Sequence, residues 1–106
     1  MTVGKILEAF EAFKKNDFTD QIKIGWIGDV EGRVLCEIHK MSPEAVTLPK
    51  GSGDTLTVPE SYSRVYLLYI AAMSELSLGH NEAYLQLFSE FEAAMSMYAK
   101  HYIRTR

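Results

Sequence analysis

The chain has 106 residues, 47% of them hydrophobic, and its 11 basic and 14 acidic residues give a net charge of −3. This composition fits one globular domain over residues 1–106 and is not that of a disordered chain or a general nucleic-acid binder. The single cysteine, Cys36, excludes an intramolecular disulfide, and the longest apolar stretch, 65–73, is too short to cross a bilayer. We therefore expect a protein of a reducing cytoplasm with no membrane partner.

The N-terminal segment has the pattern of a short amphipathic helix over about residues 2–15. Its apolar positions recur at helical spacing and are Val3, Ile6, Leu7, Phe10 and Phe13. Asn16 and Asp17 can end this helix, and Thr19 is a suitable N-cap for a second one, with Asp20 in its first turn.

Residues 22–38 allow two interpretations. With a period of 3.6 residues, one face of a helix holds Ile27, Val30, Val34 and Ile38. As strands, 22–26 and 34–38 would instead flank a turn at 29–32. Three glycines, Gly25, Gly28 and Gly32, would each cost about 1 kcal/mol against alanine in a helix. The pattern alone leaves helix and β-hairpin equally open.

Residues 41–58 change in character, because prolines and glycines separate two short β-prone pieces at 45–48 and 55–58. They predict a small exposed β-hairpin inserted at about 45–58. Its turn is expected at Lys50, Gly51, Ser52, Gly53 and Asp54. A two-stranded ribbon is marginal in isolation, so this one should need something to pair with or lean on.

The last third of the chain predicts a long antiparallel αα-hairpin, with helices over about 60–78 and 81–104. Pro59 suits the start of the first helix, Gly79 its end, and Asn81 the N-cap of the second. Each helix carries an aromatic and apolar stripe at alternating steps of four and three. The stripes are Tyr62, Tyr66, Tyr69, Met73 and Leu76, then Tyr84, Phe88, Phe91, Met95, Tyr98 and Tyr102.

No pattern of catalytic, cofactor-binding or metal-binding residues stands out. The three histidines lack the i, i+4 spacing of a metal-binding helix, and Gly51-Ser52-Gly53 lacks the lysine of a phosphate-binding loop. The sequence therefore predicts a protein that is not an enzyme and takes no cofactor or metal. Tyrosines suit either a core or an interface, since they bury a large area at low entropy cost. The candidate interface residues are Lys50, Gly51, Ser52, Gly53 and Asp54 in the loop, and Tyr84, Phe88, Tyr98 and Tyr102 in the last helix.

The order of these signals over residues 18–104 resembles a family encoded by phages and prophages of Gram-positive bacteria. The first half of the resemblance lies in Phe18-Thr19-Asp20, Lys23, Trp26-Ile27 and Val30-Glu31-Gly32-Arg33-Val34. The second half lies in Leu56-Thr57-Val58-Pro59, Tyr62, Tyr66, Tyr69, Ala71-Ala72, Asn81-Glu82, Tyr84 and Tyr102-Ile103-Arg104. The family comprises head–tail connector (adaptor) proteins of long-tailed phages.

The resemblance implies a mainly α-helical structural subunit that carries a protruding β-loop and forms a ring beneath the phage portal. It also implies no enzymatic site, no specific nucleic acid, and the portal and the downstream neck or tail-completion proteins as partners. The place of the protein would be the neck of the virion, after assembly in the host bacterial cytoplasm. The resemblance favours a helix over about 19–40, although Gly25 and Gly28 stand where the family more often has better helix formers.

A second function of a different class is a small helical protein-binding or regulatory module that acts as a dimer. It would use the stripe from Tyr84 to Tyr102 to bind a partner helix, with the basic residues Lys100, Arg104 and Arg106 facing an anionic ligand or nucleic acid. The same basic residues also suit the negative end of the last helix's dipole without any ligand.

Overall fold

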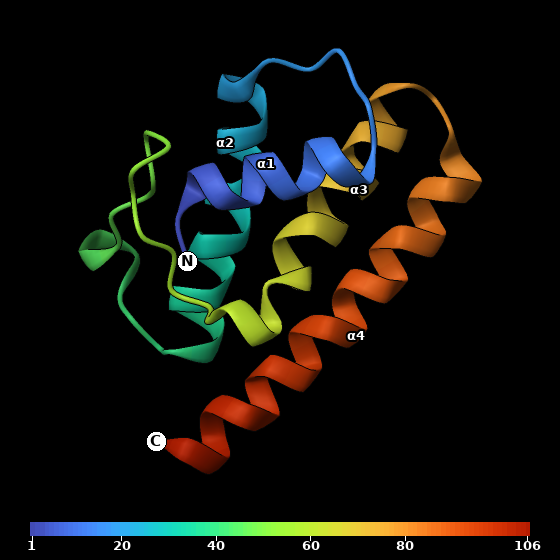
Figure 1. Cartoon of the computed structure of the whole chain (residues 1–106). Coiled ribbons are helices and arrows are strands. Elements are labelled where there is room, and N and C mark those ends of the chain that lie inside the picture. Colours follow the sequence, from blue (N-terminus) through green and yellow to red (C-terminus); the bar gives the residue numbers. More distant parts are fainter.

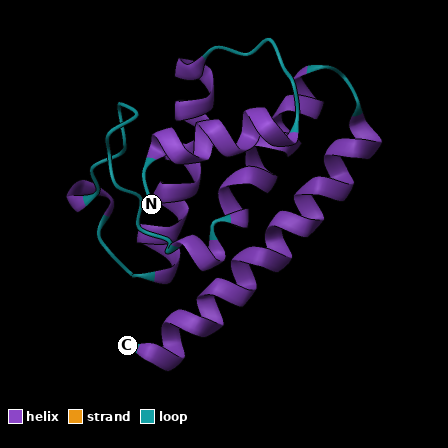
Figure 2. Ribbon diagram, in the orientation of Figure 1, coloured by secondary structure: helices purple, strands orange, loops and turns teal.

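The computed structural model describes residues 1–106 and consists of helices and loops without a sheet (Figure 2). Four α-helices follow the chain: α1 (Val3–Phe13), α2 (Asp20–Arg33), α3 (Arg64–Ser77) and α4 (Asn81–Thr105). Shorter helical turns lie at Val34–Ile38 (π-helical), Pro43–Ala45 and Glu60–Tyr62 (both 3-10). The predicted mainly α fold with four helices is confirmed.

Helix α1 begins where the Oγ1 atom of Thr2 accepts a hydrogen bond of 3.3 Å from the backbone N–H of Lys5. Its apolar stripe is buried through Phe10. The periodicity places Phe13 on the same apolar face, but this last residue of the helix is 61% exposed and is not part of the core.

The open choice over residues 22–38 is settled in favour of a helix. The Oγ1 atom of Thr19 caps α2 by accepting a 3.3 Å hydrogen bond from the N–H of Ile22, and the π-helical turn continues the helix to Ile38. A Cβ atom at Gly28 or Gly32 would lie 4.0 or 3.8 Å from the side chain of Leu48, which is ordinary van der Waals contact, so packing does not require glycine at either position.

The β-hairpin predicted at about 45–58 is not present, because residues 46–58 form a loop without a strand. We call this segment loop 46–58. Its returning arm makes one β-bridge, between Thr55 and Thr2, and the N–H of Leu56 donates to the carbonyl of Met1 (2.8 Å). The physical reason is that an isolated two-stranded ribbon is marginal, and the N-terminus offers the returning arm a partner anchored to a helix.

Helices α3 and α4 form the predicted αα-hairpin. Gly79 ends α3 with φ = +78°, and the N–H of His80 donates to the carbonyl of Glu75 (2.9 Å). The predicted N-cap at Asn81 is wrong, since Asn81 is the first residue of α4 and no side chain caps that end. The helix predicted over about 60–78 begins later than expected, because Glu60–Tyr62 is a separate 3-10 turn and α3 starts at Arg64. The predicted end of α3 and both predicted ends of α4 agree with the structure to within one residue.

The core surrounds α3, which packs against the other three helices, whereas α4 runs along the edge of the molecule (Figure 1). Three residues of α4 are buried: Phe91, Met95 and Tyr98. At 1.5 Å per residue, its 25 residues span about 37 Å, which matches the longest dimension of the molecule, 37 Å. Most of this long helix therefore has surface that the monomer leaves uncovered.

Candidate functional site

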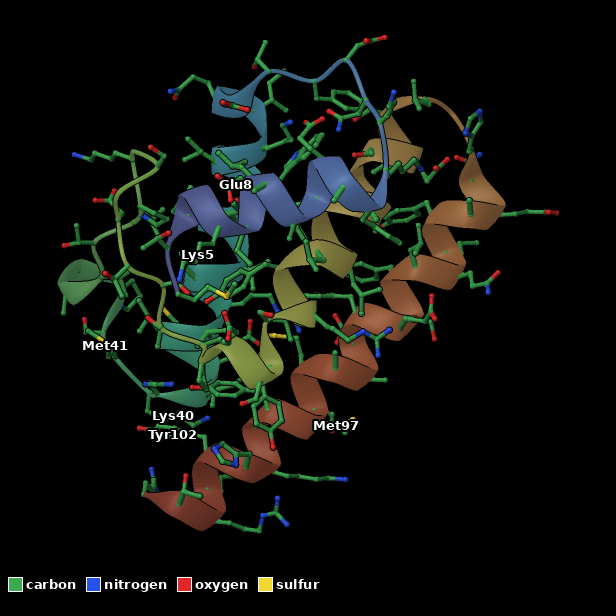
Figure 3. All side chains as sticks on the ribbon, viewed as in Figure 1. Lys5, Glu8, Lys40, Met41, Met97 and Tyr102 are labelled. Carbon is green, nitrogen blue, oxygen red and sulfur yellow. The ribbon has the colours of Figure 1, made fainter.

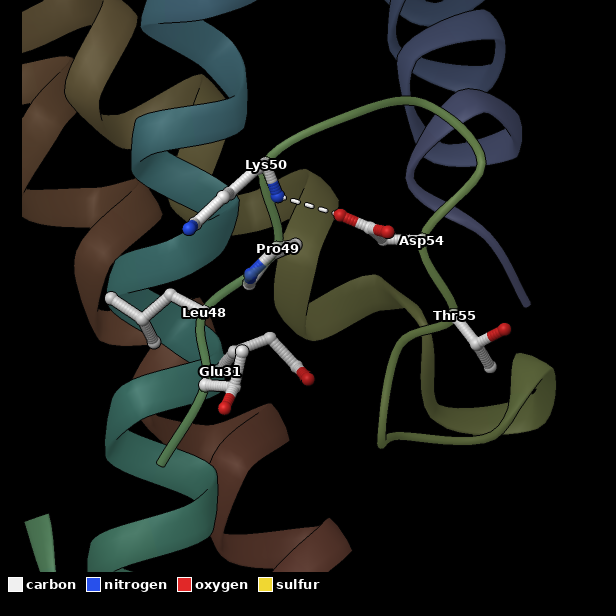
Figure 4. A pocket seen from close by; sticks show the side chains of 7 residues that line it. Glu31, Leu48, Pro49, Lys50, Asp54 and Thr55 are labelled. Atoms are coloured by element: carbon white, nitrogen blue, oxygen red, sulfur yellow. Dashed lines mark hydrogen bonds between the residues drawn. The ribbon is translucent and has the colours of Figure 1, made fainter. Parts of the chain in front are cut away.

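The predicted tip of the loop folds back on α1. The carboxylate of Asp54 accepts hydrogen bonds from the N–H groups of Lys50 (2.7 Å) and Gly51 (3.0 Å), which hold the pKa of Asp54 below its usual value (Figure 4). The carbonyls of Ser52 and Asp54 accept from the N–H groups of Gly4 (2.8 Å) and Val3 (3.0 Å), two amides of the first turn of α1. The backbone of the tip is thus fixed, while the side chain of Lys50 is exposed and in no ion pair.

A hollow of about 390 Å³ lies between loop 46–58 and α2 (Figure 4). Its lining residues are Glu31, Thr47, Leu48, Pro49, Lys50, Asp54 and Thr55. Glu31, which is 3% exposed, is its one buried residue.

The carboxylate of Glu31 is already fully engaged within the chain. It accepts hydrogen bonds from the N–H of Thr57 (3.1 and 3.2 Å), from the hydroxyl of Thr57 (2.9 Å) and from the hydroxyl of Tyr66. The same Tyr66 oxygen accepts from the N–H of Val58 (3.1 Å). Burial, followed by the bond to Glu31, raises the pKa of Tyr66, so the phenol stays protonated and keeps donating. This network anchors the returning arm of the loop.

The predicted aromatic residues Tyr84 and Phe88 are half-buried and belong to one cluster with α3. Their ring centroids lie 5.6 Å apart, and Phe88 lies 5.5 Å from Phe91, which itself lies 5.1 Å from Tyr69. The side chains of Tyr84 and Phe88 are therefore partly exposed, and their buried portions belong to the aromatic contact between α4 and α3.

The predicted residues Tyr98 and Tyr102 lie at the other end of α4 and hold His39 between them. The Nε2 atom of His39 lies 2.8 Å from the hydroxyl of Tyr98, and its ring stacks on Tyr102 with centroids 4.0 Å apart. Burial lowers the pKa of His39 and raises that of Tyr98. Tyr98 is 3% exposed and belongs to the core, whereas Tyr102, labelled in Figure 3, is half-buried.

The predicted interface residues thus lie in three separate places. Loop 46–58 and α4 are on opposite sides of the molecule, and the two aromatic clusters lie toward opposite ends of α4 (Figure 1). No chemistry joins them into a single site, and their assignment as interface residues stays a prediction.

The structure has a further surface that was not predicted from the sequence. Three hollows of about 210, 110 and 170 Å³ are all lined by Arg64, at the start of α3. The first is also lined by Phe13, Leu67 and Leu68, and the other two share Ala94 and Met97 of α4. The first hollow lies between α1 and α3 and the other two lie beside α4, so that Arg64 borders hollows on both sides of it. We call these three hollows together the Arg64 groove.

The Arg64 groove combines exposed apolar side chains with an unpaired cation. Phe13 is 61% and Met97 64% exposed, and Arg64 is in no ion pair. By contrast, Arg33 pairs with both Glu92 (2.6 Å) and Glu37 (3.1 Å). Met97 lies off the predicted stripe of α4, and this apolar residue on the polar side was the signal that could have revealed the groove (Figure 3).

No group of three or more His, Cys, Asp or Glu side chains is arranged to hold a metal ion. None of the helices combines the length and the apolar character needed to span a membrane.

Comparisons with known proteins give no relative. No protein-family model matches the chain, and neither the curated proteins nor the solved structures contain a significant match.

Proposed function

We propose that this protein is a non-enzymatic structural subunit of a head–tail connector ring below the portal of a tailed phage or prophage. The observation that carries the proposal is the exposed surface of α4. Three large apolar residues of this helix, Leu85, Met97 and Ile103, are each 64% exposed. Apolar side chains that protrude along a helix as long as the molecule favour contacts with other subunits. The resemblance over residues 18–104 supports the same role.

Loop 46–58 would supply a second contact, on the side opposite α4. The N–H groups of Thr47 and Leu48 make no hydrogen bond within the chain. An extended segment with free amides can pair with a strand of another protein. We propose that the outgoing arm gains such a partner in the assembled neck, so that the loop becomes the β-ribbon expected from the sequence only on assembly.

The test is binding to the portal protein encoded in the same gene cluster, measured by light scattering of the mixture. Lys50→Glu reverses the exposed charge at the loop tip and is expected to weaken portal binding about tenfold or more, as removal of a central charged contact does. Lys15→Glu is the matched control, because Lys15 is also exposed and in no ion pair. If the unaltered protein binds no portal or neck protein, the proposed function is wrong.

The alternative function is a dimeric helical binding module, and the basic end of α4 is the observation that favours it. Lys100, Arg104 and Arg106 are exposed and in no ion pair, and the Arg106 guanidinium lies 6.0 Å from the centre of the Tyr102 ring. A stable dimer that ignores the portal and loses an anionic ligand on Lys100→Glu/Arg104→Glu would support this alternative.

A further inference from the structure

The Arg64 groove has the chemistry of a site for an apolar segment that carries a carboxylate. Its lining residues are largely apolar, from Phe13 on α1 to Met97 on α4, and the guanidinium of Arg64 lies among them without a partner. A charge-assisted hydrogen bond to a carboxylate is about twice as strong as a neutral one, and an apolar surrounding strengthens it further. Glu90 lines one of the three hollows, yet it forms no ion pair with Arg64.

The corner between α3 and α4 presents the complementary chemistry. Leu78, in the turn, is 56% exposed, and Leu85, in the second turn of α4, is 64% exposed. Glu82 lies between them in sequence, is exposed and is in no ion pair. Since residues three apart share a helix face, Glu82 and Leu85 project together from the same side of α4.

One copy of the chain cannot bring these two surfaces together. Arg64 begins α3 and Leu78 follows its end, so the 14 residues of the helix hold them about 20 Å apart. The corner can therefore enter only the groove of another copy. A contact between two different surfaces of identical chains repeats from copy to copy and gives a ring or a filament.

We propose that the α3–α4 corner of one copy docks into the Arg64 groove of the next. Glu82 pairs with Arg64, and the exposed leucines of the corner pack against Phe13 and Met97. This inference deepens the proposed function and rests on it for the closure of the contact into a ring.

Charge reversal at the two proposed partners tests the contact. Assembly is measured by sedimentation velocity of the full chain, alone and on the portal protein. Arg64→Glu and Glu82→Arg are each expected to weaken assembly about tenfold or more, because each places like charges together in the contact. The double variant Arg64→Glu/Glu82→Arg is expected to recover it, since the pair is restored with its signs exchanged. Circular dichroism confirms that each variant is folded, and all the altered side chains are exposed.

Glu8→Arg is the matched control, because Glu8 is exposed on α1, is in no ion pair and lines none of the three hollows. It is expected to leave assembly unchanged. If Glu8→Arg abolishes assembly while Glu82→Arg does not, or if the double variant fails to recover, the corner contact is wrong.

The same measurements separate this inference from the proposed function. Rings that form equally well with Arg64→Glu and Glu82→Arg overturn the corner contact and leave the connector function standing. An unaltered protein that stays monomeric, alone and with the portal, overturns both.

Discussion

Glu31 shows at the scale of one residue how a loop without regular structure is held in place. Its carboxylate is buried and receives hydrogen bonds from the backbone and hydroxyl of Thr57 and from Tyr66. A buried carboxylate is costly unless its oxygens are satisfied, and here donors from two segments satisfy them. This single side chain of α2 therefore holds the returning arm together with the backbone partners of the arm at Met1 and Thr2.

Replacing Glu31 by glutamine should destabilise the protein strongly. The variant keeps the size of the side chain, but its amide places N–H donors where the donors of Thr57 and Tyr66 now point. We expect Glu31→Gln to lower the free energy of unfolding by about 2–4 kcal/mol. Urea denaturation measures this loss. The control Glu37→Gln affects an exposed pair with Arg33 and should cost less than about 1 kcal/mol. Equal losses for the two variants would contradict the role of Glu31.

His39 makes the stability depend on pH in a defined direction. Burial lowers the pKa of His39, so the unfolded state binds a proton more readily than the folded state. Stability is then fully present above the ordinary histidine pKa of about 6.5 and decreases as the pH falls below it.

The variant His39→Phe isolates this effect, because it keeps an aromatic ring against Tyr98 and Tyr102 and removes the titration. We expect the stability of the unaltered protein, relative to the variant, to decrease as the pH is lowered from about 7 to about 5. Urea midpoints at a series of pH values measure the difference. Parallel profiles for the two proteins would show that His39 does not titrate in this way.

At the scale of the elements, two glycines should respond to alanine with opposite signs. Gly25 lies in α2 and a Cβ there would meet nothing within 4 Å, whereas Gly79 has φ = +78° at the end of α3. We expect Gly25→Ala to raise the free energy of unfolding by about 0.5–1 kcal/mol and Gly79→Ala to lower it by about 1–2 kcal/mol. Thermal or urea denaturation of both variants checks the pair. Changes of the same sign would contradict the conformations described for these two residues.

The helices could be predicted because their signals are local. Thr2 and Thr19 each cap a helix through a side-chain oxygen, and Gly79 ends α3. Of the two caps, only Thr19 was predicted. The choice between helix and strand at 22–38 could not be made from the pattern alone, because its three glycines oppose a helix locally, while the burial that stabilises α2 comes from packing against α3, which is remote in sequence.

The loop shows the limit of local propensity more clearly. Residues 55–58 are β-prone, yet their backbone and side-chain partners are Met1, Thr2 and Glu31, which are remote in sequence. A pattern read along the chain cannot anticipate such partners. The prediction of a hairpin therefore failed while the position of its turn, at 50–54, agrees with the structure.

At the scale of the whole molecule, periodicity identifies the face of a helix but not what covers it. Tyr98 and Tyr84 occupy equivalent positions of one stripe, yet Tyr98 is buried against His39 and Tyr84 is half-exposed. Met97, an apolar residue on the polar side of α4, signals part of the Arg64 groove, but its extent could not be predicted, because three helices separated in sequence contribute its lining.

The exposed surfaces that result lie on different sides of the chain, which is what a subunit needs to contact unlike neighbours in a ring. Loop 46–58 lies on one side, and the long face of α4 with its exposed apolar residues lies on the other (Figure 1). A symmetric dimer, by contrast, would use one surface twice. The proposed ring would use both of these surfaces, each against a different neighbour.

The most direct test of the proposed function is the solution mass by light scattering, alone and mixed with the portal protein of the same gene cluster. The proposal predicts a closed multiple of the 12.0 kDa chain, or a monomer that becomes such a multiple on the portal. A small dimer whose mass is unchanged by the portal would contradict it.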